Sequence, residues 1–244
     1  MAERTQTVSQ GRVLVTRPQP ACSQTAAELA SRGYEPVLLP LSRTVALSFA
    51  LPDGPFAALT VTSANALHHM KLERLRPFLG LPLFAVGQGT ARAARKAGFG
   101  QVIDGGGDAV RLAATMRRFL PERSRILYLA GRVRQPVFED EVRAAQLDMH
   151  VADVYDTETV SYSASALLKV LDGAPFVAVM LYSGIAATSF VEAMREIEPP
   201  FSERTRFLCI SDRVADRLPA RWRANALVPN HPDEDGLFRL FAKL

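Results

Sequence analysis

A pair of strand–turn–helix segments occurs twice in this 244-residue chain. The first copy comprises Val61–Leu67 and then Phe84–Ala91, and the second comprises Leu181–Ala187 and then Leu208–Ala215, about 120 residues later. In each segment a short apolar run ends in small or polar residues, and a helix-forming stretch follows. A duplicated βα pair predicts two similar α/β domains. Ligands of open α/β sheets bind at the carboxyl ends of the strands, so these four turns are candidate binding elements.

Strands and helices alternate along the middle of the chain. The predicted strands are Ala57–Thr62, Leu83–Val86, Gln101–Asp104 and Arg125–Leu129, and the predicted helices are Ala64–Lys71, Gly89–Ala97, Ala109–Phe119 and Val137–Ala145. Strands that alternate with helices of this length predict a parallel sheet.

Two extended segments flank this middle part. The first is broken by Pro36 and Pro40, which exclude a central strand and favour an edge or a linker. We expect it to pair with the second as a two-stranded antiparallel β-ladder, formed by residues 35–46 and 149–161. The predicted fold is therefore α/β, with two similar parallel-sheet domains. Residues 1–34 and 162–244 form the first, discontinuous domain, and residues 47–148 form the second, inserted domain.

Composition favours a soluble cytoplasmic protein. The hydrophobic fraction is 48% and the charged fraction 22%, both ordinary for a globular protein. No apolar run approaches the ~18 residues that span a bilayer, and the first ten residues do not resemble a signal peptide. Cys22 and Cys209 are far apart, without His or Cys neighbours at the spacing of metal ligands. We therefore expect neither a metal site nor a disulfide, no membrane association, and a monomer.

The basic residues are 25 Arg and only 4 Lys, with a net charge of +4. One explanation is GC-rich coding, which favours Arg over Lys. The other is an acidic ligand, because guanidinium binds a carboxylate through two parallel hydrogen bonds. The arginines are scattered, without the basic runs and interleaved aromatic residues typical of nucleic-acid binding, so no nucleic-acid partner is expected.

The order and spacing of these motifs resemble those of the uroporphyrinogen-III synthase family. The segments that carry the resemblance are Val13–Pro18, Val61–Ala66, Val86–Ala91, Leu129–Arg132, Val154–Thr157, Tyr182–Phe190, Ile210–Ala215 and Pro232–Leu240. Two turns depart from the family pattern: Gly184 stands where a proline is common, and Ser211-Asp212 replaces a glycine-containing turn.

The resemblance implies two α/β domains joined by the ladder, with the active site in the cleft between them. It implies that the chain converts hydroxymethylbilane, a linear tetrapyrrole with eight carboxylates, into uroporphyrinogen III. The enzyme removes the terminal hydroxyl as water, inverts ring D and closes the macrocycle. No metal or organic cofactor takes part.

A polyanionic substrate requires many hydrogen-bond donors along an extended site. Strand-end turns provide them, because each presents the free N–H groups of the next helix. The candidate substrate-binding residues are Arg17, Thr62, Ser63, Gly87, Thr90, Gly131, Arg132, Ser183, Gly184 and Ser211. The hydroxyl residues among them also suit the role of helix N-caps, and the two arginines could equally be solvated loop residues.

Tyr155 is the candidate general acid, because the resemblance and the ladder place it in the cleft. Its neutral phenol can donate a hydrogen bond to the departing hydroxyl at neutral pH. The alternative is that it packs on the ladder in a structural role. His68 and His69 are expected on the surface or between domains, rather than as catalytic bases.

Two other classes of protein share this layout. A two-domain binding or sensor protein, without catalysis, would also have a hinge formed by two crossing strands. A nucleotide-dependent oxidoreductase would have alternating strands and helices, but Gly105-Gly106-Gly107 lacks the GxGxxG spacing and its acidic partner.

Overall fold

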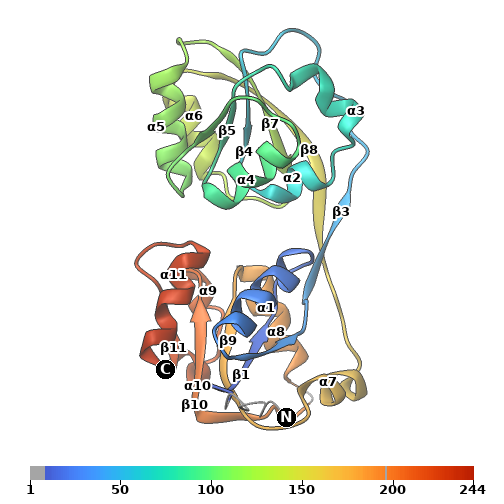
Figure 1. Ribbon diagram of the computed structural model, residues 1–244, viewed down its shortest axis with the longest axis vertical. Coiled ribbons are helices and arrows are strands. Elements are labelled where there is room, and N and C mark those ends of the chain that lie inside the picture. Colours follow the sequence, from blue (N-terminus) through green and yellow to red (C-terminus); the bar gives the residue numbers. More distant parts are fainter. Residues whose placement is uncertain (1–8, 196) are drawn as a thin grey trace, which may run out of the picture. The chain divides into compact units, whose positions relative to one another are not determined.

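The computed structural model describes residues 9–195 and 197–244, so the first eight residues of the predicted first domain lie outside the described part. The chain divides into two compact units. Met1–Arg43 and Glu158–Leu244 form one, called here the discontinuous unit, and Thr44–Thr157 forms the other, called here the inserted unit. Each contains a largely parallel sheet with helices on both faces, which confirms the predicted α/β class with parallel sheets (Figure 1).

The discontinuous unit contains a five-stranded sheet in the order β11-β10-β9-β1-β2. Its strands are β1 (Arg12–Val15), β2 (Glu35–Leu38), β9 (Phe176–Leu181), β10 (Phe201–Cys209) and β11 (Ala226–Leu227), and neighbouring strands are parallel. Its helices are α1 (Ala21–Ser31), α7 (Ala164–Leu171), α8 (Gly184–Ala193), α9 (Asp212–Ala215), α10 (Ala220–Arg223) and α11 (Glu234–Arg239), followed by the 3₁₀ turn Leu240–Lys243.

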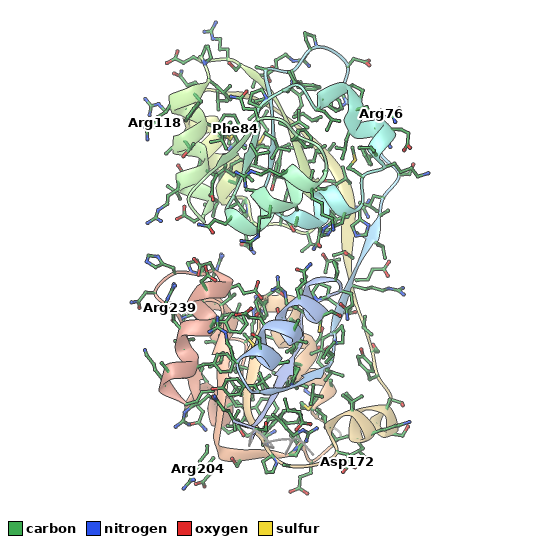
Figure 2. The ribbon with its side chains drawn as sticks, viewed as in Figure 1. Arg76, Phe84, Arg118, Asp172, Arg204 and Arg239 are labelled. Atoms are coloured by element: carbon green, nitrogen blue, oxygen red, sulfur yellow. The ribbon has the colours of Figure 1, made fainter. Side chains whose placement is uncertain are left out.

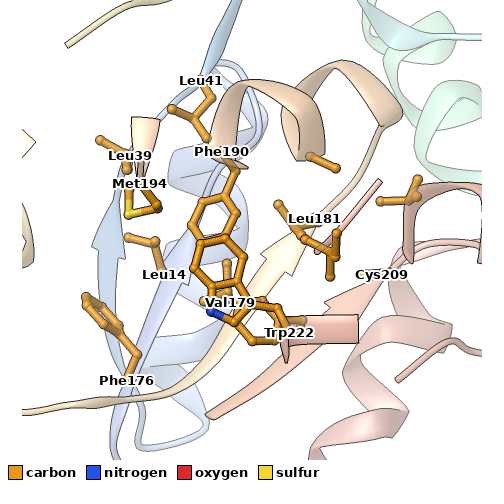
Figure 3. Packing of buried hydrophobic residues seen from close by; sticks show 14 of the residues in the cluster. Leu14, Leu39, Leu41, Phe176, Val179, Leu181, Phe190, Met194, Cys209 and Trp222 are labelled. Carbon is orange, nitrogen blue, oxygen red and sulfur yellow. The ribbon is translucent and has the colours of Figure 1, made fainter. Parts of the chain in front are cut away.

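Alternate residues of these strands enter two cores, one on each face of the sheet. On one face α7, α8, α9 and α10 cover an aromatic cluster in which the rings of Phe190 and Trp222 have centroids 5.3 Å apart (Figure 3). On the other face α1 and α11 cover Val13 and Val15. Strands that are buried on both faces must be apolar throughout, which explains why β1 and β9 read as continuous apolar runs in the sequence.

The inserted unit contains a six-stranded sheet in the order β3-β8-β7-β4-β5-β6. Its strands are β3 (Ser42–Ala46), β4 (Ala58–Val61), β5 (Leu83–Ala85), β6 (Val102–Asp104), β7 (Arg125–Gly131) and β8 (Asp148–Thr159). Its helices are α2 (Ala64–His68), α3 (Leu72–Leu75), α4 (Gln88–Lys96), α5 (Ala109–Phe119) and α6 (Val137–Ala144), with a 3₁₀ turn at Arg76–Phe78.

The helices of the inserted unit also divide between two faces. Leu59 and Val61 of β4 face α2, α3 and α4, whereas Ala58 of the same strand faces α5 and α6. Figure 2 shows Phe84 within the unit, while Arg118 of α5 lies at its outer edge. Ala58 and Leu59 face different helices because successive side chains of a strand point to opposite faces of the sheet.

The segments expected to form only a linker also contribute strands to the two sheets. Glu35–Leu38 pairs in parallel with β1 and forms the edge strand of that sheet. The edge position that Pro36 predicted is therefore observed, but the strand belongs to the sheet of the discontinuous unit and not to the ladder. Residues 148–155 pair in parallel with β7. The apolar residues Ala152 and Val154 are buried there, so this part of the chain belongs to the core of the inserted unit.

The two strand orders are related by a circular permutation. In the discontinuous unit the chain forms β1 and β2 and then crosses to the other side of β1 to form β9, β10 and β11. In the inserted unit it forms β4, β5 and β6 and then crosses to the other side of β4 to form β7 and β8. The reversal falls between β1 and β9 in one sheet and between β4 and β7 in the other. Such switch points, at the carboxyl ends of the strands, are where doubly wound sheets bind ligands.

Candidate active site

At the switch point of the inserted unit, the turn after β4 lies against a tyrosine of β7. The Thr62 hydroxyl and the Tyr128 hydroxyl are 2.6 Å apart and hydrogen-bonded. Burial raises the pKa of Tyr128 to about 12, an effect that the hydrogen bond to Thr62 only partly offsets. Thr62 was predicted from the sequence, whereas Tyr128 was not, because it sits within an apolar strand.

Tyr155 of β8 lies over the last residue of β7. A Cβ atom built on Gly131 would stand 2.5 Å from Cζ and 2.8 Å from the hydroxyl of Tyr155, far inside van der Waals contact. The backbone fixes this contact, because Gly131 pairs with Tyr155 in the sheet and the Arg132 N–H donates to the Tyr155 carbonyl at 2.9 Å. Glycine at position 131 therefore makes room for the phenol at the sheet edge.

The neighbours of the Tyr155 phenol are His69, Ser63 and Arg134. The His69 ring stacks on it, with centroids 5.7 Å apart and planes inclined by 23°, and His69 Nε2 is 2.8 Å from the Thr44 hydroxyl. Burial raises the pKa of Tyr155, although the side chains of Ser63 and Arg134 act in the opposite direction. The phenol thus remains a neutral donor well beyond neutral pH.

Arg134 is a site residue that the sequence did not reveal. Its guanidinium donates to Asp153 at 2.6 Å, to Glu139 at 2.5 Å and to the Gly131 carbonyl at 2.8 Å. It thereby fixes the chain just after β7. Its position in a polar loop, two residues beyond Arg132, gave no signal that distinguished it from a solvated arginine.

Arg132 itself is more exposed. Its Nη1 donates to Asp156 at 3.0 Å, and 58% of its side chain is accessible. The predicted residues Thr62, Ser63, Gly131, Arg132 and Tyr155 thus gather where β4 and β7 end and where β8 leaves its pairing with β7.

At the switch point of the discontinuous unit, Arg17 follows β1 and lies over the Tyr182 ring, 4.2 Å from its centroid. Its Nη1 donates to Glu234 Oε1 at 2.7 Å. The same oxygen accepts hydrogen bonds from the Thr25 hydroxyl at 2.6 Å and from the Tyr182 hydroxyl at 3.3 Å. Burial raises the pKa of Tyr182, so this phenol too is a neutral donor.

The remaining predicted residues of this unit begin helices. Ser183 is the N-cap of α8 and accepts from the Ala186 N–H at 3.1 Å, and Gly184 is the first residue of that helix. Ser211 occupies the N-cap position of α9, without a side-chain capping hydrogen bond. In the inserted unit Ser63 is the N-cap of α2 and accepts from the Asn65 N–H, two residues on, at 3.2 Å.

A profile of the family described as Uroporphyrinogen-III synthase HemD matches residues 23–239, which is most of the chain. The chain belongs to the uroporphyrinogen-III synthase family.

Two solved structures are similar to it in fold. The uroporphyrinogen-III synthetase of Helicobacter pylori is 18% identical, with 96% of this chain and 99% of that chain aligned and a TM-score of 0.64. A mutant uroporphyrinogen III synthase of the extremely thermophilic bacterium Thermus thermophilus is 15% identical, with 96% and 98% aligned and a TM-score of 0.50. No curated protein sequence matches the chain significantly.

As a uroporphyrinogen-III synthase, the protein is a cyclising lyase of porphyrin and haem biosynthesis. It closes hydroxymethylbilane to uroporphyrinogen III with loss of water and inversion of ring D. Within the described residues there is no group of three or more His, Cys, Asp or Glu that could hold a metal ion. None of the helices in the described part is long and apolar enough to cross a membrane.

In this synthase Thr90 does not have the N-cap role that its hydroxyl suited. It is buried in the first turn of α4, where Gly87 holds the N-cap position. The preceding Gln88 and Gly89 are less buried. Gly87 retains the predicted position after β5.

Proposed function

We propose that the Tyr155 phenol donates a hydrogen bond to the hydroxyl that leaves hydroxymethylbilane. The observation that carries this proposal is the contact between the phenol and Gly131, at the switch point of the inserted sheet. The pyrrole nitrogen donates electron density to the carbon that the hydroxyl leaves, so a weak acid is sufficient to assist the departure of the hydroxyl. A neutral phenol with a raised pKa suits that role over the whole neutral range.

We further propose that strand-end turns of both units bind the substrate carboxylates. The residues are Arg17, Ser183, Gly184 and Ser211 in the discontinuous unit, and Thr62, Ser63, Gly87, Gly131 and Arg132 in the inserted unit. Support comes from the helix starts at Ser63 and Ser183, where backbone N–H groups remain without intrahelical partners. Binding the bilane in a folded conformation is the main task, because the chemical step itself is easy and its direction depends on positioning.

The proposed function also includes the two-domain architecture. A ladder of β3 and β8 would join the domains; the hydrogen bonds from Leu47 N to Val154 O and from Val160 N to Leu41 O support antiparallel pairing, because the residue number rises on one strand as it falls on the other. We propose a cytoplasmic monomer that acts on the linear tetrapyrrole and binds neither nucleic acid nor membrane. Size-exclusion chromatography with light scattering tests the monomer.

The decisive experiment compares wild type with Tyr155→Phe on hydroxymethylbilane generated enzymatically, followed by oxidation and separation of the porphyrin isomers. The variant keeps the ring that packs on His69 and Gly131 and loses only the hydroxyl. We expect kcat to fall about 10²-fold, the lower end for a positioned general acid, with an unchanged Tm and isomer III as the product.

Two outcomes would contradict the proposal. A wild-type protein that leaves isomer I would be a binding protein and not a synthase. A Tyr155→Phe variant with wild-type kcat would make Tyr155 a structural residue, and the acid would then be sought elsewhere, for example in a substrate carboxyl group.

A further inference from the structure

The network around Glu234 has the composition of a carboxylate-binding site. Its donors are a guanidinium (Arg17), an aliphatic hydroxyl (Thr25) and a phenol (Tyr182), from three different elements. All three donate hydrogen bonds to one oxygen, Glu234 Oε1, at 2.7, 2.6 and 3.3 Å respectively. Charge-assisted hydrogen bonds of this kind are the strong ones that select anions.

The three donors lie at strand ends or in a packed helix, whereas the acceptor, Glu234, follows an irregular segment. Arg17 and Tyr182 follow the two strands that flank the switch point, and Thr25 is buried in α1. Glu234 instead begins α11 after the irregular segment 228–233, and 42% of its side chain is exposed. The donors are therefore preorganised, and the carboxylate that they hold is the replaceable part.

Helix α11 is held by contacts that do not involve the Glu234 side chain. Helix α11 keeps its N-cap, because Asp233 accepts from the Gly236 N–H at 2.6 Å independently of Glu234. It also keeps the buried Leu237 and Phe238. Partly exposed ion pairs contribute little net stability, so a competing carboxylate can displace this one.

We propose that Glu234 occupies, in the absence of substrate, a subsite that takes one substrate carboxylate, and that it is displaced when substrate binds. The proposal rests on the proposed function of the strand-end turns. Glu234 then acts as an internal competitor: it keeps Arg17 oriented and screened, and only a ligand with a carboxylate at this position releases it.

The test measures KM and kcat for wild type, Glu234→Gln and Glu158→Gln on enzymatically generated hydroxymethylbilane. Glu158→Gln makes the same change of charge in an exposed pair between β8 and Arg43 of β3, outside the network, and serves as the matched control. Because Glu234→Gln removes the competing charge, we expect KM to fall about two- to fivefold with little change in kcat. The control is expected to keep wild-type values.

An unchanged KM or a raised KM for Glu234→Gln would overturn the proposal, since the raised value would mean that Glu234 only holds Arg17 in place. If Glu234→Gln lowers Tm strongly, Arg17→Gln gives a second test: the subsite requires KM to rise severalfold, and an unchanged KM refutes it. If each variant still produces isomer III, the proposed function stands even where the KM values refute the subsite. The two proposals can therefore fail separately.

Discussion

The two units share a doubly wound topology, but their switch points carry different chemistry. In the discontinuous unit an arginine, Arg17, meets a carboxylate and stands over a phenol ring. In the inserted unit two phenols lie at the switch point: Tyr128 is hydrogen-bonded to Thr62, and the Tyr155 ring lies against Gly131. In the first edge the phenol packs against an ion pair, whereas in the second edge the phenols stand beside the ion pairs of Arg132 and Arg134 and form separate neutral donors. A duplicated fold therefore need not duplicate a site, because the side chains that follow each strand decide what the edge can bind.

The largest expected effect concerns the independence of the inserted unit. Residues 44–157 should give a cooperative thermal melt on their own, whereas residues 47–148, the boundary predicted from sequence, should not. The shorter piece lacks the buried Ala152, Val154 and Tyr155 of β8. At ~1.5–3 kcal/mol for each large buried side chain, the loss of Val154 and Tyr155 alone approaches the lower end of a typical domain stability of ~5–15 kcal/mol. Near-UV and far-UV circular dichroism would show the difference, and a cooperative melt for residues 47–148 would refute it.

The next effect tests whether the inserted edge depends on its glycine. In Gly131→Ala the new methyl group collides with the Tyr155 ring, which must move because the backbone pairing is fixed. We expect a loss of ~1–3 kcal/mol in the free energy of unfolding and a fall in kcat at least as large as that of Tyr155→Phe.

Gly80→Ala is the matched control, because a Cβ atom there meets no heavy atom within 4 Å. If Gly131 acts through the phenol, adding Gly131→Ala to Tyr155→Phe should lower kcat little further. Wild-type activity in Gly131→Ala would remove the phenol from the mechanism.

The smallest effect separates charge from neutral donors directly. Raising the salt concentration from ~20 to ~500 mM should raise KM a few-fold, because ion pairs at an accessible arginine are screened over a Debye length of about 8 Å at physiological ionic strength. It should leave kcat nearly unchanged, because the Tyr155 phenol is neutral. Steady-state kinetics at several salt concentrations measures both constants. A KM independent of salt would assign binding to backbone N–H groups instead of Arg17 and Arg132.

Local sequence signals predicted the regular elements well. Helix α5 has the predicted bounds, because Asp108 caps its first turn. The four-residue helix α10 and the two-residue strand β11 were missed, because such short segments complete about one hydrophobic period or less.

The site was predictable only as far as it follows from strand ends or from the family resemblance. Gly131 emerged from its position at the end of a strand, whereas Tyr155 emerged from the resemblance and from the extended segment that contains it. Glu234 did not, because its bond to Arg17 joins residues separated by 217 positions. The N-cap role of Thr90 was not confirmed, because α4 starts at Gln88, one residue before the predicted start, and Gly87 takes the N-cap position.

The insertion also sets an order of events during synthesis. Thr16 at the end of β1 donates to the Met180 carbonyl of β9, 164 residues later in the chain. At about 5–20 residues per second, the ribosome completes residues 44–157 before β9 exists. The inserted unit can thus fold before β9 is available to pair with β1. Until then the apolar residues Val13 and Val15 of β1 remain incompletely covered. During translation the first strand to be made is among the last to be buried, and this is where a nascent-chain chaperone would find its longest-lived target.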